Sequence, residues 1–80
     1  MGERERWQGH GHVRIVVDRL LEQRQLSIYQ LSRRSGLPYQ TCYRLVRQTT
    51  RRIDLGTIAA LCHALDCEPG DIFVYEPPER

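Results

Sequence analysis

Apolar residues in the first third of the chain recur at helical spacing. Between residues 12 and 24 they follow the pattern i, i+3, i+4, i+7, i+8, which places them in one stripe along a helix. The charged residues of the same segment fall on the other face. The stripe consists of Val13, Val16, Val17, Leu20 and Leu21. This pattern predicts an amphipathic helix over residues 12–24.

A second, short helix is predicted over residues 28–35. Ser27 is a good N-cap, because its side-chain oxygen can accept a hydrogen bond from a free N–H group of the first turn. Leu31 would face inward and the two arginines that follow it outward. Gly36 stands where the end of a helix needs a positive φ. The segment therefore predicts a helix that ends in a tight turn.

A third helix, predicted over residues 38–47, has one apolar and one polar face. Pro38 suits its first turn, where the missing N–H removes no hydrogen bond. The apolar face is formed by Cys42, Leu45 and Val46. The polar face lies roughly opposite and is formed by Gln40, Arg44 and Arg47. Tyr39 and Tyr43 flank the polar face, where each ring either stays exposed or covers the edge of the core.

The last third of the chain predicts one longer helix and an irregular end. Asp54 can cap a helix whose inward residues are Leu55, Ile58, Leu61, Cys62 and Leu65. Pro69 and Gly70 break the chain, and residues 71–75 form either a final short helical turn or a short strand. The expected fold is all-α, a compact five-helix domain over residues 12–75. A flexible N-terminal arm, 1–11, would precede it and a tail, 76–80, would follow.

Chain length restricts the classes of function. The sequence has 80 residues, about half of an average domain of roughly 150. We therefore expect one small domain, too short for a Rossmann-type fold or a large active-site cavity. We also expect no cofactor. No apolar run approaches the ~20 residues of a membrane span, and the N-terminus lacks the pattern of a signal peptide. A cytoplasmic protein is expected.

Charge is distributed unevenly along the chain. Residues 13–52 hold nine arginines and two acids, a net charge of +7, whereas residues 53–80 hold six acids and one arginine, a net charge of −5. The whole chain carries only +2. Such an asymmetry favours a surface on the middle segment that faces a polyanion.

Cysteine and histidine residues offer a zinc alternative that their spacing disfavours. The three cysteines, Cys42, Cys62 and Cys67, are odd in number and form no CxxC pair. His63 is adjacent to Cys62, so the two side chains would point in different directions on a helix. We therefore expect cysteines of the core and no metal site. No Ser/His/Asp or paired-carboxylate arrangement indicates an enzyme. Trp7, in the arm, would either pack back on the domain, which we favour, or follow the arm into the minor groove of a bound duplex.

Two short helices joined at a glycine are typical of a helix-turn-helix. Residues 27–45 resemble the helix-turn-helix of phage repressor/Cro-like (XRE-type) regulators, whose pattern positions are occupied here by Ser32, Gly36, Leu37, Cys42 and Leu45. Residues 52–73 resemble the family's next helix and its Pro-Gly-Asp turn. The sequence departs from the commoner residues at Ile28, Ser32 and Pro38.

The resemblance implies a lambda-repressor-like domain that binds double-stranded DNA in a sequence-specific manner and regulates transcription. The helix 38–47 would read the major groove, and a homodimer would bind a palindromic operator. Tyr39, Gln40 and Tyr43 match base-contacting positions of the family. The full set of expected DNA-binding residues is Ser27, Tyr39, Gln40, Thr41, Tyr43, Arg44, Arg47, Arg51 and Arg52.

A different class of function is an alternative. An antitoxin-like or phage-encoded protein-interaction module would have another protein as its main partner. The acidic last third of the chain favours it, as does the apolar run at residues 72–75, which a partner or a second protomer could cover. Co-purification separates the two classes, because an antitoxin brings a stoichiometric partner with it.

Overall fold

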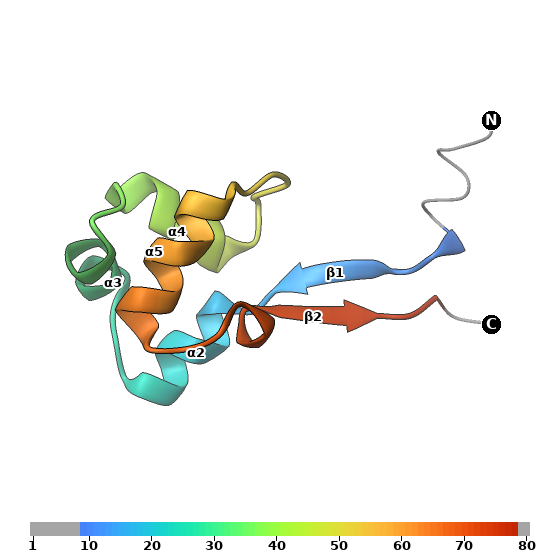
Figure 1. Cartoon of the computed structure of the whole chain (residues 1–80), viewed down its shortest axis with the longest axis horizontal. Helices are drawn as coiled ribbons and strands as arrows, with labels where there is room; N and C mark the ends of the chain where they lie inside the picture. Colours follow the sequence, from blue (N-terminus) through green and yellow to red (C-terminus); the bar gives the residue numbers. More distant parts are fainter. Residues whose placement is uncertain (1–8, 79–80) are drawn as a thin grey trace.

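A computed structural model describes residues 9–78 of the chain. Its helices form a body from which a two-stranded ribbon extends (Figure 1), and the whole measures 43 × 21 × 19 Å. In chain order the elements are β1 (His12–Ile15), α2 (Val17–Arg24), α3 (Ile28–Ser35), α4 (Tyr39–Arg47), α5 (Leu55–Leu65), the 3-10 helix η1 (Pro69–Asp71) and β2 (Phe73–Glu76). The mostly helical fold predicted from the sequence is confirmed.

The first predicted helix is wrong over its first turn. Residues 12–15 form strand β1, and the helix α2 begins only at Val17. β1 pairs antiparallel with β2, so that Val13 lies opposite Tyr75 and Ile15 opposite Phe73. Two β-branched residues at alternate positions suit this pairing. The same residues also fit helical spacing, and only the partner strand decides between the two.

The predicted fifth helix is also replaced. Residues 69–71 form a single 3-10 turn, and the chain then enters β2, which is the strand alternative for this segment. β2 includes Glu76, the first residue of the expected tail, because Glu76 pairs with His12. The described residues thus hold four α-helices instead of five. Trp7 and most of the predicted arm lie outside the described residues.

The core lies between the four helices and is apolar throughout. No polar or charged residue among residues 9–78 is buried. The fully enclosed side chains come from every α-helix and from the turn before β2, and they include Val17, Leu31, Cys42, Leu45, Leu61, Leu65 and Ile72. Cys62 and Cys67 are partly buried and pack against this core, as expected. In residues 9–78 there is no helix whose length and hydropathy would let it cross a bilayer.

Candidate nucleic-acid interface

Helices α3 and α4 are joined by a turn that hydrogen bonds hold from both sides. The Ser32 hydroxyl donates to the carbonyl oxygen of Leu37 at 2.7 Å, and the Leu37 N–H donates to the Ser35 hydroxyl oxygen at 3.1 Å. Gly36 lies between them with φ of 79°, the left-handed conformation expected at this position. The polar side chain at Ser32 therefore does more than a small apolar residue would, because it fixes the turn against α3.

The start of each of these helices agrees closely with the sequence. Ser27 caps α3: its hydroxyl accepts the Gln30 N–H at 3.0 Å, and the Gln30 side chain accepts the Ser27 N–H at 2.9 Å. This reciprocal pair is a capping box. α4 begins at Tyr39, one residue later than predicted, because Pro38 has an extended ψ of 147° and serves as the N-cap.

The outer face of α4 carries polar side chains that the fold leaves free. Cys42 and Leu45 are buried beneath the helix, whereas Gln40, Arg44 and Arg47 are exposed. Within residues 9–78, neither the Gln40 nor the Arg44 side chain makes a hydrogen bond to another residue. Their donors and acceptors are therefore available to a ligand.

One flank of this face is aromatic. The rings of Tyr39 and Tyr43 stack with centroids 6.5 Å apart and planes 24° from parallel. They are 50% and 40% exposed, so each residue presents a large part of its surface to solvent. The guanidinium of Arg47 lies 5.7 Å from the centre of the Tyr43 ring.

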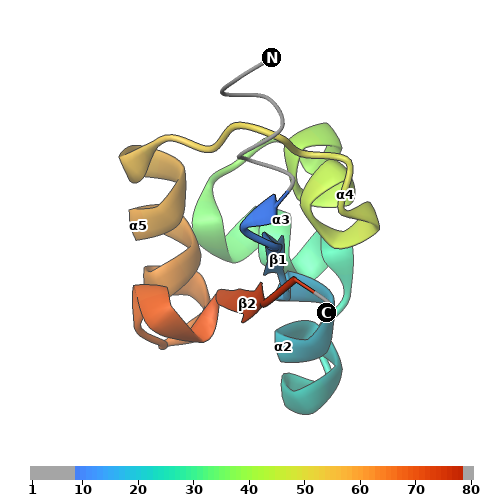
Figure 2. The same ribbon diagram turned by 90° about the vertical axis from the view of Figure 1, so that its right-hand side faces the viewer.

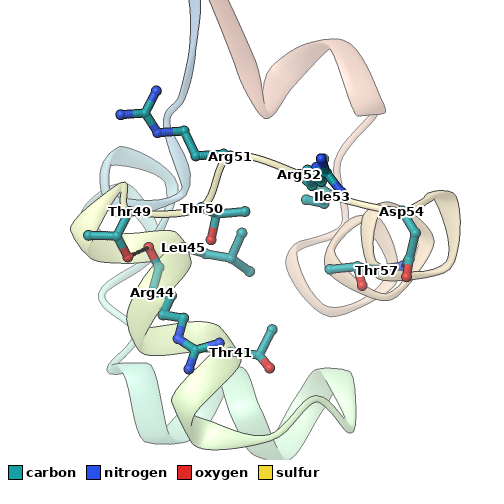
Figure 3. Close-up of a pocket in the computed structure, with 10 residues that line it drawn as sticks. All are labelled: Thr41, Arg44, Leu45, Thr49, Thr50, Arg51, Arg52, Ile53, Asp54 and Thr57. Atoms are coloured by element: carbon teal, nitrogen blue, oxygen red, sulfur yellow. Dashed lines mark hydrogen bonds between the residues drawn. The ribbon is translucent and has the colours of Figure 1, made fainter.

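The other flank of α4 borders an open cleft of about 610 Å³. In the view along the ribbon, the segment between α4 and α5 spans the gap between these helices (Figure 2). It forms one wall of the cleft, and α4 and the start of α5 form the others (Figure 3). The polar lining residues are Thr41, Arg44, Thr49, Thr50, Arg51, Arg52, Asp54 and Thr57. Three arginines and four threonines in this lining suit an anion such as phosphate.

Asp54 is the one acidic residue among the described residues that line the cleft. Its carboxylate accepts the Thr57 N–H at 2.7 Å and so caps α5, as predicted. This backbone hydrogen bond lowers the pKa of Asp54 below its ordinary value. The carboxylate is therefore already engaged in holding the helix start, where the helix dipole offsets part of its charge.

Eight of the nine predicted DNA-binding residues gather around α4. Thr41, Arg44, Arg51 and Arg52 line the cleft, and Tyr39, Gln40, Tyr43 and Arg47 occupy the rest of the outer face of the helix. Ser27 is exposed at the start of α3 and does not line the cleft. The Ser27 hydroxyl is engaged in the cap. An anion at this end of α3 would therefore be bound by the backbone N–H groups of the first helical turn, next to Ser27.

Sequence reasoning missed several residues of this region. Thr57 comes from the next helix and reaches the cleft only through the fold. Arg14, expected on a helix face, donates from Nη1 to the Gln48 side chain at 3.0 Å and from Nε to Glu76 at 3.1 Å. It thereby ties the ribbon to the end of α4. No group of three or more His, Cys, Asp or Glu side chains in residues 9–78 could hold a metal ion.

Comparisons with known proteins agree with this architecture. Residues 16–78 match the family described as the Cro/C1-type HTH DNA-binding domain. The chain is 37% identical over 65 residues to YozG of Bacillus subtilis (strain 168), named an uncharacterized HTH-type transcriptional regulator, and the match covers 81% of this chain and 77% of YozG. No solved structure is significantly similar. The resemblance seen in the sequence is thus confirmed, and this chain belongs to the Cro/C1-type helix-turn-helix DNA-binding family.

Proposed function

We propose that this protein binds double-stranded DNA in a sequence-specific manner and regulates transcription, with α4 inserted in the major groove. The observation that carries the proposal is the outer face of α4, where polar side chains without a hydrogen-bond partner in residues 9–78 lie beside an arginine-lined cleft. The major groove, about 12 Å wide, admits one helix. A protein with this activity acts where the DNA of the cell lies, and we expect that compartment to be the cytoplasm.

The residues of the interface divide into two roles. Gln40, near the N-terminus of α4, can donate to N7 and accept from N6 of adenine at the same time. Arg44, Arg47, Arg51 and Arg52 extend along the later part of the helix and the loop beyond it, where the phosphate backbone is the nearest partner. The first-turn N–H groups of α3, beside Ser27, offer a further phosphate contact. Base reading and backbone holding thus fall to different parts of one surface.

A dimer on a palindromic operator would give this surface its selectivity. One recognition helix reads only a few base pairs, too few to single out a site in a genome. The ribbon carries two exposed apolar side chains directly opposite each other, Val13 at 61% and Tyr75 at 59% exposure. A two-stranded ribbon is also marginal by itself and has open edges. We infer that the ribbon of a second copy covers them, with half-sites about 34 Å apart.

Selection from a random duplex pool, followed by sedimentation of the protein free and on the selected duplex, tests this proposal. We expect the pool to converge on an inverted repeat and the complex to contain two protomers. A pool that converges on no sequence would refute sequence-specific binding. A monomer both free and on DNA would refute the dimer alone.

The ribbon also supports the second candidate function, a module that binds another protein. The exposed Val13–Tyr75 pair is what such a partner would cover. Purification of the tagged full chain from its own host separates the two candidates. A stoichiometric partner protein together with no convergence of the DNA pool would favour the interaction module.

A further inference from the structure

The outer surface of α4 is divided lengthwise into strips of different chemistry. Gln40 and Arg44 lie along its centre. Successive residues of a helix are rotated in a constant sense, so Thr41 falls on one side of this centre and Tyr39 and Tyr43 on the other. The Thr41 side is the hydrophilic wall of the cleft. The tyrosine side is an aromatic strip.

The aromatic strip has the properties of a preformed contact. Both rings are about half exposed, and they stack on each other with centroids 6.5 Å apart. A ring that is already packed against its neighbour loses less conformational freedom when it meets a ligand. The guanidinium of Arg47 near the Tyr43 ring restricts it further.

A helix seated in the major groove would press this strip against the edges of bases. The C5 methyl of thymine is the apolar group that the four base pairs present there, and apolar side chains recognise it by contact. The rise from Gln40 to Tyr43 is about 4.5 Å at 1.5 Å per residue. One base step is about 3.4 Å. The ring therefore reaches a base one or two steps from the one beside Gln40.

We propose that the Tyr39–Tyr43 pair is a thymine-specific contact: the ring of Tyr43, supported by Tyr39, packs on the C5 methyl of a thymine within two steps of the adenine read by Gln40. This rests on the proposed function and names the bases that the site selects. The hydroxyl of Tyr43 is not required for the contact, because the ring supplies the apolar surface.

Replacement of single thymines by deoxyuridine in the selected duplex tests the contact, since it removes only the methyl group. Burial of one methyl group is worth a several-fold change in affinity, so we expect the wild-type protein to bind about three- to fivefold more weakly at one or two positions in each half-site. Tyr43→Ala should lose this difference between thymine and deoxyuridine. Tyr43→Phe should keep it, because the ring remains.

Tyr29→Ala is the matched control. Tyr29 lies on α3, is 59% exposed and has Arg33 at 5.7 Å from its ring centre, the same distance as Arg47 from Tyr43. We expect this variant to discriminate between thymine and deoxyuridine as the wild type does. Circular dichroism of all variants establishes that each is folded, which is expected because the substituted rings lie outside the core.

The outcomes of these experiments distinguish a failure of the thymine contact from a failure of the proposed DNA binding on which it rests. A pool that converges on a preferred sequence, followed by indifference to every deoxyuridine, overturns the thymine contact and leaves DNA recognition intact. Loss of discrimination in Tyr43→Phe as complete as in Tyr43→Ala also overturns it, since the hydroxyl would then be the contacting group. A pool without any preferred sequence overturns both.

Discussion

Polar side chains of the helix-turn-helix differ in whether the fold already uses them. Ser27, Ser32 and Asp54 are each engaged in a cap or turn hydrogen bond. Gln40 and Arg44 make no side-chain hydrogen bond to any other residue of the described part of the chain. The residues with cap or turn hydrogen bonds stabilise the fold, whereas Gln40 and Arg44 keep their donors and acceptors available for a ligand. Substitutions in the two groups should therefore have separate consequences, in stability and in binding.

The first prediction concerns Gln40, which can read one base. Gln40→Ala should cost about 1–3 kcal/mol of binding free energy on the selected duplex and relax discrimination at one base position. The reason is the loss of paired donor and acceptor contacts to a base edge. Affinities for the selected and for a scrambled duplex measure this effect. An equal loss on both duplexes would mean that Gln40 contacts the backbone.

Arg51 supplies the complementary variant. It extends from the loop beyond α4 (Figure 3), where a phosphate is the expected partner. Arg51→Ala should weaken binding to selected and scrambled duplexes alike and reduce the magnitude of the salt slope by about one. Neither residue is part of the core, so the free energy of unfolding should stay unchanged. A loss confined to the selected duplex would instead assign base reading to Arg51.

The second prediction concerns the buried thiol of Cys42. Burial raises the pKa of this thiol above its ordinary value, against a smaller opposing effect of the Ser35 hydrogen bond. The folded protein therefore keeps this thiol protonated at a pH at which the unfolded chain ionises it. The free energy of unfolding is therefore unaffected by this thiol below the ordinary thiol pKa. It declines as the pH rises above that value, because ionisation of Cys42 then favours the unfolded chain.

Burial should also protect Cys42 from thiol reagents, because the thiolate is the reactive form. The rate of thiol labelling at about pH 8 measures this protection. Cys42, which is 0% exposed, should react only when the protein unfolds. Cys62 and Cys67 are partly exposed and should be labelled earlier. Mass spectrometry of the labelled peptides identifies each site. Early labelling of Cys42 in the folded protein would contradict the packing of α4 on the core.

At the scale of elements, the turn between α3 and α4 depends on one backbone conformation. Gly36 has φ of 79°, and a Cβ atom there would meet nothing within 4 Å. Gly36→Ala should therefore cost about 1–2 kcal/mol of unfolding free energy through backbone strain alone. Gly36→Asn should cost less, because asparagine tolerates this conformation better. Denaturant titration compares the three proteins, and equal stability of all three would contradict the observed turn.

The ribbon depends on a glycine for a different reason. Gly11 has φ of 81°, and a Cβ atom would lie 2.3 Å from the Glu76 carbonyl oxygen, a clash with backbone. Gly11→Ala should open the end of the ribbon that this contact closes. Hydrogen exchange at the amides of β1 and β2 should accelerate by about tenfold or more, while the amides of α5 keep their protection. Unchanged exchange in the ribbon would contradict the pairing of β1 with β2.

At the scale of the whole molecule, charge and shape are organised along the chain. The basic block of residues 13–52 includes α4, whereas the acidic segment that follows, residues 53–80, supplies all of α5 and the second strand of the ribbon. One end of the molecule is the helical body with the candidate interface, and the ribbon extends from it (Figure 1). In the proposed complex, the helical body would meet DNA while the ribbon stays available to a second copy.

The fifth prediction follows from the charge of the interface. Each phosphate neutralised by an arginine contributes about −0.9 to the slope of log affinity against log salt. The four expected contacts, from Arg44, Arg47, Arg51 and Arg52, give roughly −4 for each protomer and about twice that for a dimer on two half-sites. Binding to a duplex at a series of salt concentrations measures the slope. A flat response would contradict an electrostatic interface.

The local features of this protein were determined by the sequence itself. The capping pair at Ser27, the left-handed Gly36 and the apolar face of α4 each depend on residues no more than a few positions apart, so their spacing could be read directly. The exposure of Gln40 follows from the same spacing, because it lies opposite Cys42 and Leu45 on one helix. For this reason the helix-turn-helix and its outer face could be predicted almost residue by residue.

Only the tertiary structure decided the ribbon and the cleft. Residues 12–15 satisfy a helical period and a strand alternation equally well, and pairing with Phe73–Glu76 at the far end of the chain selects the strand. Arg14 was consequently assigned to a helix face, whereas it bridges the ribbon and the end of α4. Thr57 likewise joins Arg44 and Arg52 in the lining of the cleft only because α3 packs against both α4 and α5 and so places the start of α5 across the cleft from α4. Contacts between distant segments depend on how whole faces pack, which no short stretch of sequence encodes.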